Sequence, residues 1–245
     1  MANTDLFDLS DFAKMTNSDS DSDNENSKNN NDQVFDEKTV EINQKSIKIR
    51  EFHYSTTNAG YIWPATFTMA DYISKNIQVF NNKKIIELGS ATGILSIYLK
   101  QIGLNVTASD YNDPEIQENI EYNSKLNDIH FNYIPHSWGE EFPKEKNDFD
   151  IVIASDILLY VSHFDKLIST LKQLMDERKD SFLLISYKRK MSNVRIFFDL
   201  MMKNGFQYET VGQRIWILRK SDNIDLKNPP SLHFEGDNND EEDEN

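Results

Sequence analysis

The sequence predicts an α/β fold built on a doubly wound, mostly parallel seven-stranded sheet that ends in an antiparallel hairpin. Short runs rich in β-branched and aromatic residues alternate with longer stretches in which apolar residues recur every three or four positions. This alternation of strands and helices favours right-handed crossovers and a parallel sheet with helices on both faces. The last two apolar runs are separated by only three residues, which is too short for a crossover, so they form a hairpin.

The expected strands and helices follow one another from Lys84 onward. The strands are short apolar runs bounded by turn residues. The seven expected strands are residues 84–88, 105–109, 130–134, 149–155, 181–187, 206–210 and 214–218. The helices carry an apolar stripe, as in Phe164, Leu167 and Ile168. The four expected helices are residues 92–102, 114–127, 162–178 and 191–204.

The charge of the chain is concentrated at its two ends. Of the 245 residues, 41 are acidic and 26 are Lys or Arg, which gives a formal net charge of −15. Residues 1–37 hold ten acidic side chains and two lysines, and residues 221–245 hold nine acidic side chains and one lysine. Residues 38–220 are therefore close to neutral. We expect one globular domain over 38–220 between two acidic, disordered tails.

Several classes of protein and site are disfavoured by what the sequence lacks. There is no cysteine, which excludes disulfides, thiolate metal sites and a cysteine nucleophile. No histidines show metal-ligand spacing, so no metal site is expected. No cluster of Lys and Arg offers a phosphate-binding surface, so no nucleic-acid partner is expected. Neither a signal-peptide pattern nor eighteen consecutive apolar residues occur, so we expect no membrane association and a cytoplasmic or nuclear location.

A glycine-bearing turn follows the first expected strand. It has the sequence ELGSATG at residues 87–93 and leads directly into the first expected helix. Glycine lets the chain reverse sharply and bring its backbone against a ligand. The dinucleotide pattern G-x-G-x-x-G is absent, because position 91 is Ala. This difference disfavours a loop that binds a pyrophosphate.

Asp110 follows the second expected strand, 17 residues beyond Gly93. In folds of this kind an acidic side chain at this place accepts hydrogen bonds from ribose hydroxyls. A lone glycine turn is often only a packing feature, and a strand-end Asp often only caps the next helix. Together, in this order and without a pyrophosphate loop, the two features favour a nucleoside-type cofactor, and we expect S-adenosylmethionine.

Four segments resemble the seven-strand S-adenosylmethionine-dependent methyltransferases and, within them, the lysine-methyltransferase-like group called methyltransferase family sixteen. They are IIELGSATG (85–93), TASDY (107–111), HSWGEEFP (136–143) and the stretch from FDIVIASD to LISTL (149–171). The segment IWPA at 62–65 matches the part of that group just before the helix that precedes the first strand. The resemblance covers residues 50–218 and implies a Rossmann-like methyltransferase domain.

The resemblance also implies roles for individual residues. Asp110 is implied to bind the ribose, Trp138 to lie beside the adenine and Trp63 to close the cofactor pocket. Asp156 and Tyr160 are implied to be catalytic residues at the mouth that faces the acceptor. The residues implied in cofactor binding are Trp63, Glu87, Gly89, Gly93, Asp110, Trp138 and Ser155.

Two positions depart from the pattern of that family. The family usually has an acidic residue followed three positions later by Tyr, whereas Tyr160 follows Asp156 by four and Leu159 occupies the expected place. In a helix, such a shift turns the side chain by about 100°. Ala91 stands where the family commonly has Gly. At a positive φ this alanine would cost on the order of 1 kcal/mol, and at a negative φ its methyl group would only narrow the pocket.

The implied function is transfer of a methyl group from S-adenosylmethionine to a side-chain nitrogen of a protein substrate. Lysine is the expected acceptor, and the protein is expected to be a monomer. Two alternatives stay open, namely methylation of a small amine and a catalytically silent module that only binds. The chain has no long insertion that could build a lid, which favours a macromolecular acceptor.

Four side chains near the implied site have structural alternatives. Asp156 could be the N-cap of a helix that begins near Val161. His136 and His163 are expected to pack or to lie at the surface rather than act as bases. His53 precedes the expected core and is assigned to an N-terminal hairpin.

Overall fold

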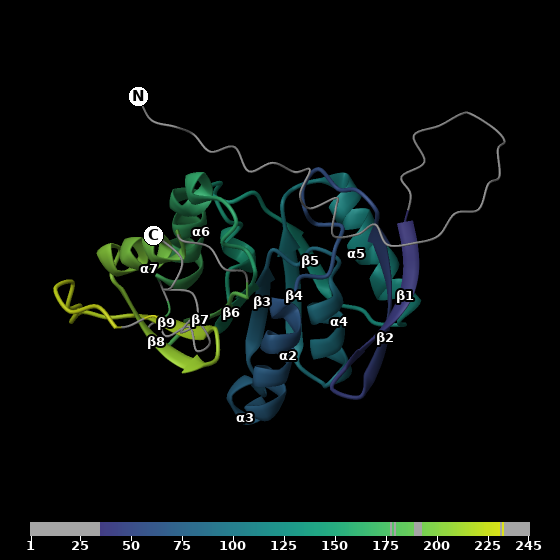
Figure 1. Cartoon of the computed structure of the whole chain (residues 1–245), viewed down its shortest axis with the longest axis horizontal. Helices are drawn as coiled ribbons and strands as arrows, with labels where there is room; N and C mark the ends of the chain where they lie inside the picture. Colours follow the sequence, from purple (N-terminus) through teal and green to yellow (C-terminus); the bar gives the residue numbers. More distant parts are fainter. Residues whose placement is uncertain (1–34, 177, 179, 189–192, 231, 233–245) are drawn as a thin grey trace, which may run out of the picture. The chain divides into compact units, whose positions relative to one another are not determined.

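The computed structural model describes residues 35–176, 178, 180–188, 193–230 and 232. Its main sheet has seven strands: β3 (Lys84–Leu88), β4 (Asn105–Asp110), β5 (Asn132–Pro135), β6 (Ile151–Ser155), β7 (Phe182–Ser186), β8 (Phe206–Gly212) and β9 (Ile215–Lys220). In space they follow the order β5-β4-β3-β6-β7-β9-β8, with only β9 antiparallel to its neighbours (Figure 1). The predicted α/β fold with its C-terminal hairpin is therefore confirmed. The strand order reverses between β3 and β6, and ligands bind at the carboxyl ends of strands beside such a point.

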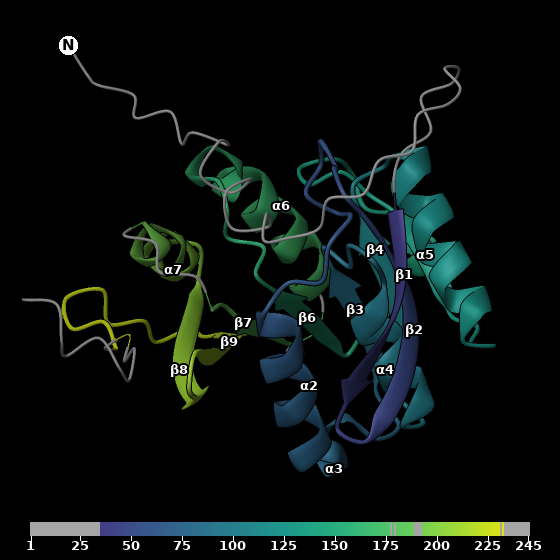
Figure 2. The same ribbon diagram turned by 45° about the vertical axis from the view of Figure 1, so that its right-hand side comes forward.

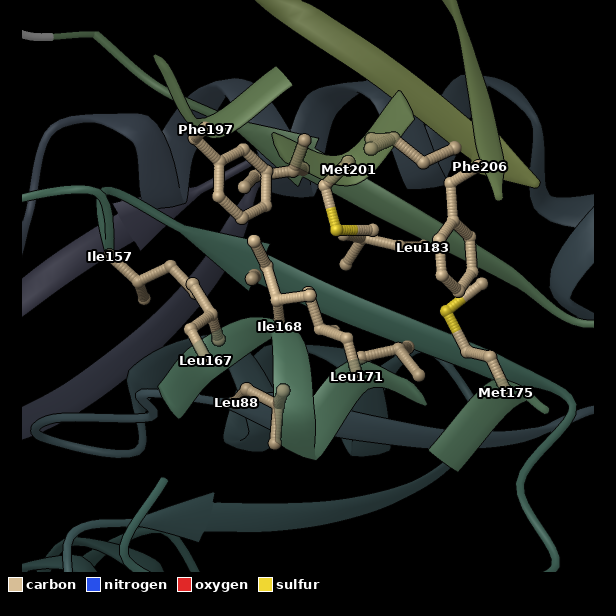
Figure 3. Packing of buried hydrophobic residues seen from close by; sticks show 14 of the residues in the cluster. Leu88, Ile157, Leu167, Ile168, Leu171, Met175, Leu183, Phe197, Met201 and Phe206 are labelled. Atoms are coloured by element: carbon tan, nitrogen blue, oxygen red, sulfur yellow. The ribbon is translucent and has the colours of Figure 1, made fainter. Parts of the chain in front are cut away.

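Helices cover both faces of this sheet. They are α2 (Ala65–Lys75), α3 (Ile77–Phe80), α4 (Ile94–Gln101), α5 (Pro114–Leu126), α6 (Phe164–Met175) and α7 (Val194–Lys203), with short 3₁₀ turns η1 (Lys144–Lys146) and η2 (Val161–His163). On one face Leu88 belongs to an apolar cluster with Leu167 of α6 and Phe197 of α7 (Figure 3). On the other face Ile85 clusters with Met69 of α2. No helix within the described ranges is long and apolar enough to span a bilayer.

The expected ends of the strands and helices are close to the observed ones. Each of the seven strands of the main sheet lies within two residues of its expected bounds, and α4, α5, α6 and α7 lie within three of theirs; α2 and α3 were not among the four helices expected from the apolar period. The largest differences surround α6, which was expected over 162–178 and spans Phe164–Met175. Its expected first turn is instead the separate 3₁₀ turn η2. Residues 157–160, which precede that turn, form neither helix nor strand.

A separate two-stranded hairpin precedes the main sheet. β1 (Phe35–Ile42) pairs antiparallel with β2 (Lys45–Phe52) around a turn whose two residues, Asn43 and Gln44, both have positive φ. β1 begins at Phe35, three residues before the expected N-terminal boundary of the domain at residue 38. The start of this strand was assigned to the tail because its sequence, FDEKTVEI, is acidic. In the structure the Phe35 ring packs edge-on against Phe52. The rest of the expected tail, residues 1–34, lies outside the described residues.

Two other expectations about the ends of the domain can be compared with the structure. His53, assigned to the hairpin, bonds Asp36 of β1 through Nε2 at 2.8 Å, which confirms that assignment. Residues 221–230 contain no helix or strand, yet the Tyr208 hydroxyl of β8 donates to the Pro230 carbonyl at 2.6 Å and Ile224 packs against the apolar cluster. The ordered contacts therefore extend beyond residue 220, the expected end of the domain. Residues 231 and 233–245 lie outside the described residues.

Asparagines on α5 fasten the hairpin to the glycine turn. The backbone N–H of Arg50 in β2 donates to the Asn123 side-chain oxygen at 2.7 Å, and the Asn123 amide donates to the Thr92 carbonyl at 3.0 Å. One turn later, at the C-cap of α5, the Lys48 N–H donates to the Asn127 side-chain oxygen at 2.9 Å. Asn123 is fully buried, so it ties β2, α5 and the turn at residues 89–93 into one unit.

Replacing Asn123 with alanine should lower the free energy of unfolding by about 2 kcal/mol, because buried backbone groups of Arg50 and Thr92 lose their partner. Thermal or denaturant unfolding measures this change. The matched control is Glu121→Ala, an exposed position on the same helix, which should change stability by less than about 0.5 kcal/mol. Equal stability of the two variants would contradict the role given to Asn123.

Candidate active site

The glycine turn and Asp110 lie on the same rim of the sheet. β3 and β4 are adjacent and parallel, so their carboxyl ends meet. The Ser90 N–H donates to the Ser109 carbonyl at 3.1 Å, and the Ala91 N–H donates to the Asp110 carboxylate at 2.7 Å. These bonds confirm that the ends of β3 and β4 lie side by side, with Asp110 against the glycine turn. Cofactor binding by these residues stays a prediction.

The glycines of the turn are required by backbone shape and by space. Gly89 and Gly93 have φ of 69° and 77°, in the left-handed region where a side chain causes strain. A Cβ at Gly89 would lie 2.6 Å from Ile157 Cγ2, and one at Gly93 would lie 3.3 Å from Ile120 Cγ2. The close approach of Ile157 also brings the segment after β6, expected to face the acceptor, against the cofactor turn.

Ala91 adopts the strained one of its two expected conformations. Its φ is 49°, which costs an L-residue on the order of 1 kcal/mol. Two contacts offset this strain, namely the hydrogen bond from its N–H to Asp110 and packing of its methyl group against the cluster of Ala59, Ile116 and Ile120. Alanine in place of the family's glycine at position 91 therefore does not disrupt the hydrogen bond between the turn and Asp110.

A buried carboxyl group, that of Glu87, and a partly buried one, that of Asp110, lie beside this turn. Burial raises the pKa of Glu87 to about 8, and the nearby charge of Asp110 acts in the same direction. Burial likewise raises the pKa of Asp110 to about 6, against the hydrogen bonds from Ala91 and Tyr111 that lower it. Ser96 of α4 donates a hydrogen bond to Glu87. Such a pair of carboxyls suits a ligand that carries positive charge and hydroxyl donors, as S-adenosylmethionine does with its sulfonium, ammonium and ribose groups.

The stability of the protein without cofactor should fall as pH rises from about 5 to about 8. Glu87 keeps its proton up to about pH 8 in the folded protein but loses it near pH 4.5 in the unfolded chain. Between these values the folded state binds more protons than the unfolded state, so the free energy of unfolding falls as the pH rises. Asp110 adds the same trend up to about pH 6. One such carboxyl contributes a slope of at most about 1.4 kcal/mol per pH unit. Thermal unfolding across this range measures it, and Glu87→Gln should flatten the dependence. The exposed control Glu121→Gln should keep the wild-type dependence of stability on pH. If Glu87→Gln keeps the same dependence as this control, Glu87 is not the group responsible.

Asp156 lies at the end of β6 and is only 2% exposed. One carboxylate oxygen accepts the N–H of Ala65, the first residue of α2, at 2.7 Å, and the other accepts the Lys188 N–H after β7 at 2.8 Å. Asp156 therefore caps α2 and joins three segments at the rim. The expected alternative, an N-cap for the helix near Val161, is wrong, because Tyr160 precedes η2 and makes no side-chain cap bond. The implied catalytic role of Asp156 stays a prediction.

Tyr160 lies at the surface beside this carboxylate segment, with 51% of its area exposed. Residues 157–160 are not helical, so the expected helical rotation of about 100° does not apply to it. Its hydroxyl accepts a hydrogen bond from the Asn58 side-chain amide at 3.1 Å, and its ring contacts His163 edge-on. Trp63, which is half-buried, donates its indole N–H to the Asn58 carbonyl at 3.0 Å. No sequence motif points to Asn58.

The remaining predicted residues lie around the same rim. Trp138 follows β5, is half-buried and packs against the apolar cluster of α6 and α7. Its segment is tied to the cofactor side because the His136 N–H donates to the Asp110 carbonyl at 2.9 Å. His136 itself is buried with its ring nitrogen 3.2 Å from Thr170, which confirms a packing role. Ser155 is the buried last residue of β6.

One cavity lies away from this rim. It has a volume of about 390 Å³ and is lined by residues near the amino ends of strands, among them Lys84, Asn105 and Asn132. That edge is opposite the rim where parallel sheets bind ligands, so the cavity is separate from the site. The described residues contain no group of three metal-binding side chains.

Comparison with known proteins agrees with this geometry. Residues 41–204 match the family described as lysine methyltransferase. A protein N-terminal and lysine N-methyltransferase of Schizosaccharomyces pombe is 27% identical over 183 residues, which are 68% of this chain and 72% of that protein. An EEF1A lysine methyltransferase of Xenopus tropicalis is 29% identical over 145 residues, 58% of this chain and 64% of that protein.

A solved structure supports the fold alone. The 16S rRNA N2 G1207 methyltransferase of T. thermophilus, solved with AdoMet and guanosine, superposes with a TM-score of 0.59 at 13% identity, over 77% of this chain and 51% of that one. The matched family spans the glycine turn, Asp110 and the segment after β6. The chain therefore belongs to the lysine methyltransferase family and is an S-adenosylmethionine-dependent methyltransferase.

Proposed function

We propose that the rim formed by the glycine turn and Asp110 holds S-adenosylmethionine, and that a lysine of a protein substrate enters between residues 53–64 and residues 156–163. The observation that carries this proposal is the joined seat of buried Glu87, the left-handed glycine turn and Asp110. The carboxyl group of Asp110 can accept the ribose hydroxyls, and Glu87 lies beneath the turn that faces the charged end of the cofactor.

The remaining contacts to the cofactor are assigned from their position on the rim. Trp63 and Trp138 would enclose it from two sides, and the backbone at Gly89, which has no side chain, would approach it closely. When bound, S-adenosylmethionine supplies an already activated methyl group, so the protein chiefly has to align the acceptor nitrogen with it. This is why the site needs few reactive side chains.

Asp156 is proposed to orient the acceptor amine. Each of its two oxygens accepts one backbone N–H, and a carboxylate is a charge-assisted acceptor for an amine. The bonds to Ala65 and Lys188 fix this carboxylate in place. The lysine has to be neutral to attack, and the apolar and aromatic surroundings of Ile157, Tyr160 and Val161 favour the neutral amine.

A macromolecular acceptor fits this mouth better than a small amine. Tyr160 and Val161 are 51% and 37% exposed, and no described helix or strand covers them. One relative is named as acting on EEF1A, so EEF1A is the first acceptor to test. We propose that the protein acts as a monomer in the cytoplasm or nucleus. Because residues 38–220 are near neutral, we also propose that it has no nucleic-acid partner.

The decisive experiment is methyl transfer from radiolabelled S-adenosylmethionine. The purified protein is incubated with purified EEF1A and, separately, with cell extract, and Asp110→Ala serves as the control impaired in cofactor binding. Label on a protein lysine, lost in the control, supports the proposal. Label in the low-molecular-weight fraction would support a small-amine methyltransferase instead. If calorimetry shows cofactor binding but no label is transferred, the result would support a catalytically silent binding module.

A further inference from the structure

Residues 53–64 form a loop that crosses the rim of the sheet. The loop is closed at its base, where the Phe52 N–H donates to the Gly60 carbonyl at 3.1 Å. Its Ala59 packs with Ile116 and Ile120 of α5 on the cofactor side. In Figures 1 and 2 the loop lies at the end of the sheet where α5 begins, and it continues into α2. It therefore links the cofactor side of the rim with the acceptor side.

Asn58 is the residue of this loop that contacts both sides. Its side-chain amide donates to the hydroxyl of Tyr160, 102 positions away in the chain, at 3.1 Å. Its carbonyl oxygen accepts the indole N–H of Trp63 at 3.0 Å. Its φ of 59° lies in the left-handed region, which Asn tolerates better than most residues. One residue thus bonds the two aromatic side chains assigned to closing the cofactor pocket and to facing the acceptor.

We propose that Asn58 is a positioning residue that holds Tyr160 in place for the acceptor and couples it to Trp63. This inference rests on the proposed function, because it gives Tyr160 a use in acceptor binding. The Tyr160 ring is half exposed and would lose rotational freedom when a substrate binds. The bond from Asn58 fixes the phenol before binding, so that loss is smaller. Because the amide nitrogen can only donate, the phenol oxygen accepts in this bond and its own proton stays available to another partner.

The test uses three variants of the full chain. Asn58→Gly keeps the left-handed backbone and the carbonyl that bonds Trp63, and it removes only the side-chain amide. Tyr160→Phe removes the other partner of the same bond. Asn58→Asp keeps the size of the side chain and can accept the Tyr160 O–H, so it re-forms the contact with reversed polarity. Thermal unfolding confirms that each variant is folded before it is compared.

Steady-state kinetics provide the first readout. We expect Asn58→Gly and Tyr160→Phe each to raise the KM for the labelled acceptor by roughly 3- to 10-fold, the range for one lost hydrogen bond, with less change in kcat. The double variant should be no worse than Tyr160→Phe, and Asn58→Asp should recover part of the loss. The affinity for S-adenosylhomocysteine, measured by calorimetry, should change by less than about twofold in Asn58→Gly. An unchanged acceptor KM, or additive effects in the double variant, would overturn the proposal.

Hydrogen–deuterium exchange gives a second readout that needs no acceptor. In Asn58→Gly and in Tyr160→Phe, backbone exchange should rise in both residues 53–64 and residues 157–163, while α5 stays protected. Exchange that rises in only one of these segments would show that Asn58 does not couple them. If the wild-type protein labels neither EEF1A nor any extract protein, the proposed function and the acceptor role of Asn58 fail, while the exchange result still decides whether the two segments are coupled.

Discussion

Gly89→Ala should abolish measurable cofactor binding and lower the free energy of unfolding by about 3 kcal/mol. The added Cβ would lie 2.6 Å from Ile157 Cγ2, so Ile157 or the turn has to move, which typically costs about 1–3 kcal/mol. The φ of 69° adds strain of about 1–2 kcal/mol. Both effects act on the backbone that approaches the cofactor, so we expect affinity for S-adenosylhomocysteine to fall more than about 100-fold. Calorimetric titration and thermal unfolding measure the two changes.

The matched control is Gly103→Ala, beyond the far end of α4. Gly103 has a φ of 88°, so alanine is strained there as well, but a Cβ would meet nothing within 4 Å. This variant should lose about 1–2 kcal/mol of stability and keep wild-type cofactor affinity. The pair of variants therefore separates backbone strain from the loss of space at the site. Wild-type binding by folded Gly89→Ala would show that the turn does not approach the cofactor.

Asp110→Ala should weaken cofactor binding roughly 100-fold while the protein stays folded. The variant loses charge-assisted hydrogen bonds to the ribose, worth about 1.5–3 kcal/mol, and the bond that holds the Ala91 N–H. Because the pKa of Asp110 is about 6, wild-type affinity should also fall as pH drops below 6, where the carboxylate becomes protonated. Calorimetric titration with S-adenosylhomocysteine on both sides of that pH measures this, and Asp110→Ala should show a weaker dependence.

A neighbouring acidic residue provides the control for Asp110. Asp113 is the N-cap of α5, and its carboxylate accepts the Glu115 N–H at 2.8 Å. Asp113→Ala should cost about 1 kcal/mol of stability and leave cofactor affinity nearly unchanged. If both variants weakened cofactor binding equally, a general effect of negative charge near the rim would explain the result, and the ribose contact assigned to Asp110 would be wrong.

The features that the sequence located well are local ones. Strand and helix periods are visible in short windows, so the seven strands of the main sheet and four of the six described α-helices were predicted with bounds within three residues. The period did not predict α2 and α3. Asp110 follows its strand directly, and parallel neighbours bring strand ends together, so its place beside the glycine turn could be inferred. The first strand of the hairpin was partly missed, because its exposed face is acidic and resembles a tail.

The use of individual side chains at the site depended on contacts between distant parts of the chain. Asp156 could be placed at the mouth from its motif, but its bonds to Ala65 and Lys188 join residues 91 and 32 positions away. The bond between Asn58 and Tyr160 spans 102 positions and has no local signal. The conformation of Ala91 was also open, since an alanine can adopt either sign of φ.

The sequence by itself determined the fold class, the cofactor seat and the family resemblance of this protein, because hydrophobic period, turn glycines and strand-end acids are properties of short segments. Only the tertiary structure decided that Asp156 is held by two backbone N–H groups, that Ala91 is strained and that Asn58 joins Trp63 to Tyr160. Those facts arise from packing between segments far apart in the chain, and hydrogen-bond partners of that kind are fixed only when the segments come together.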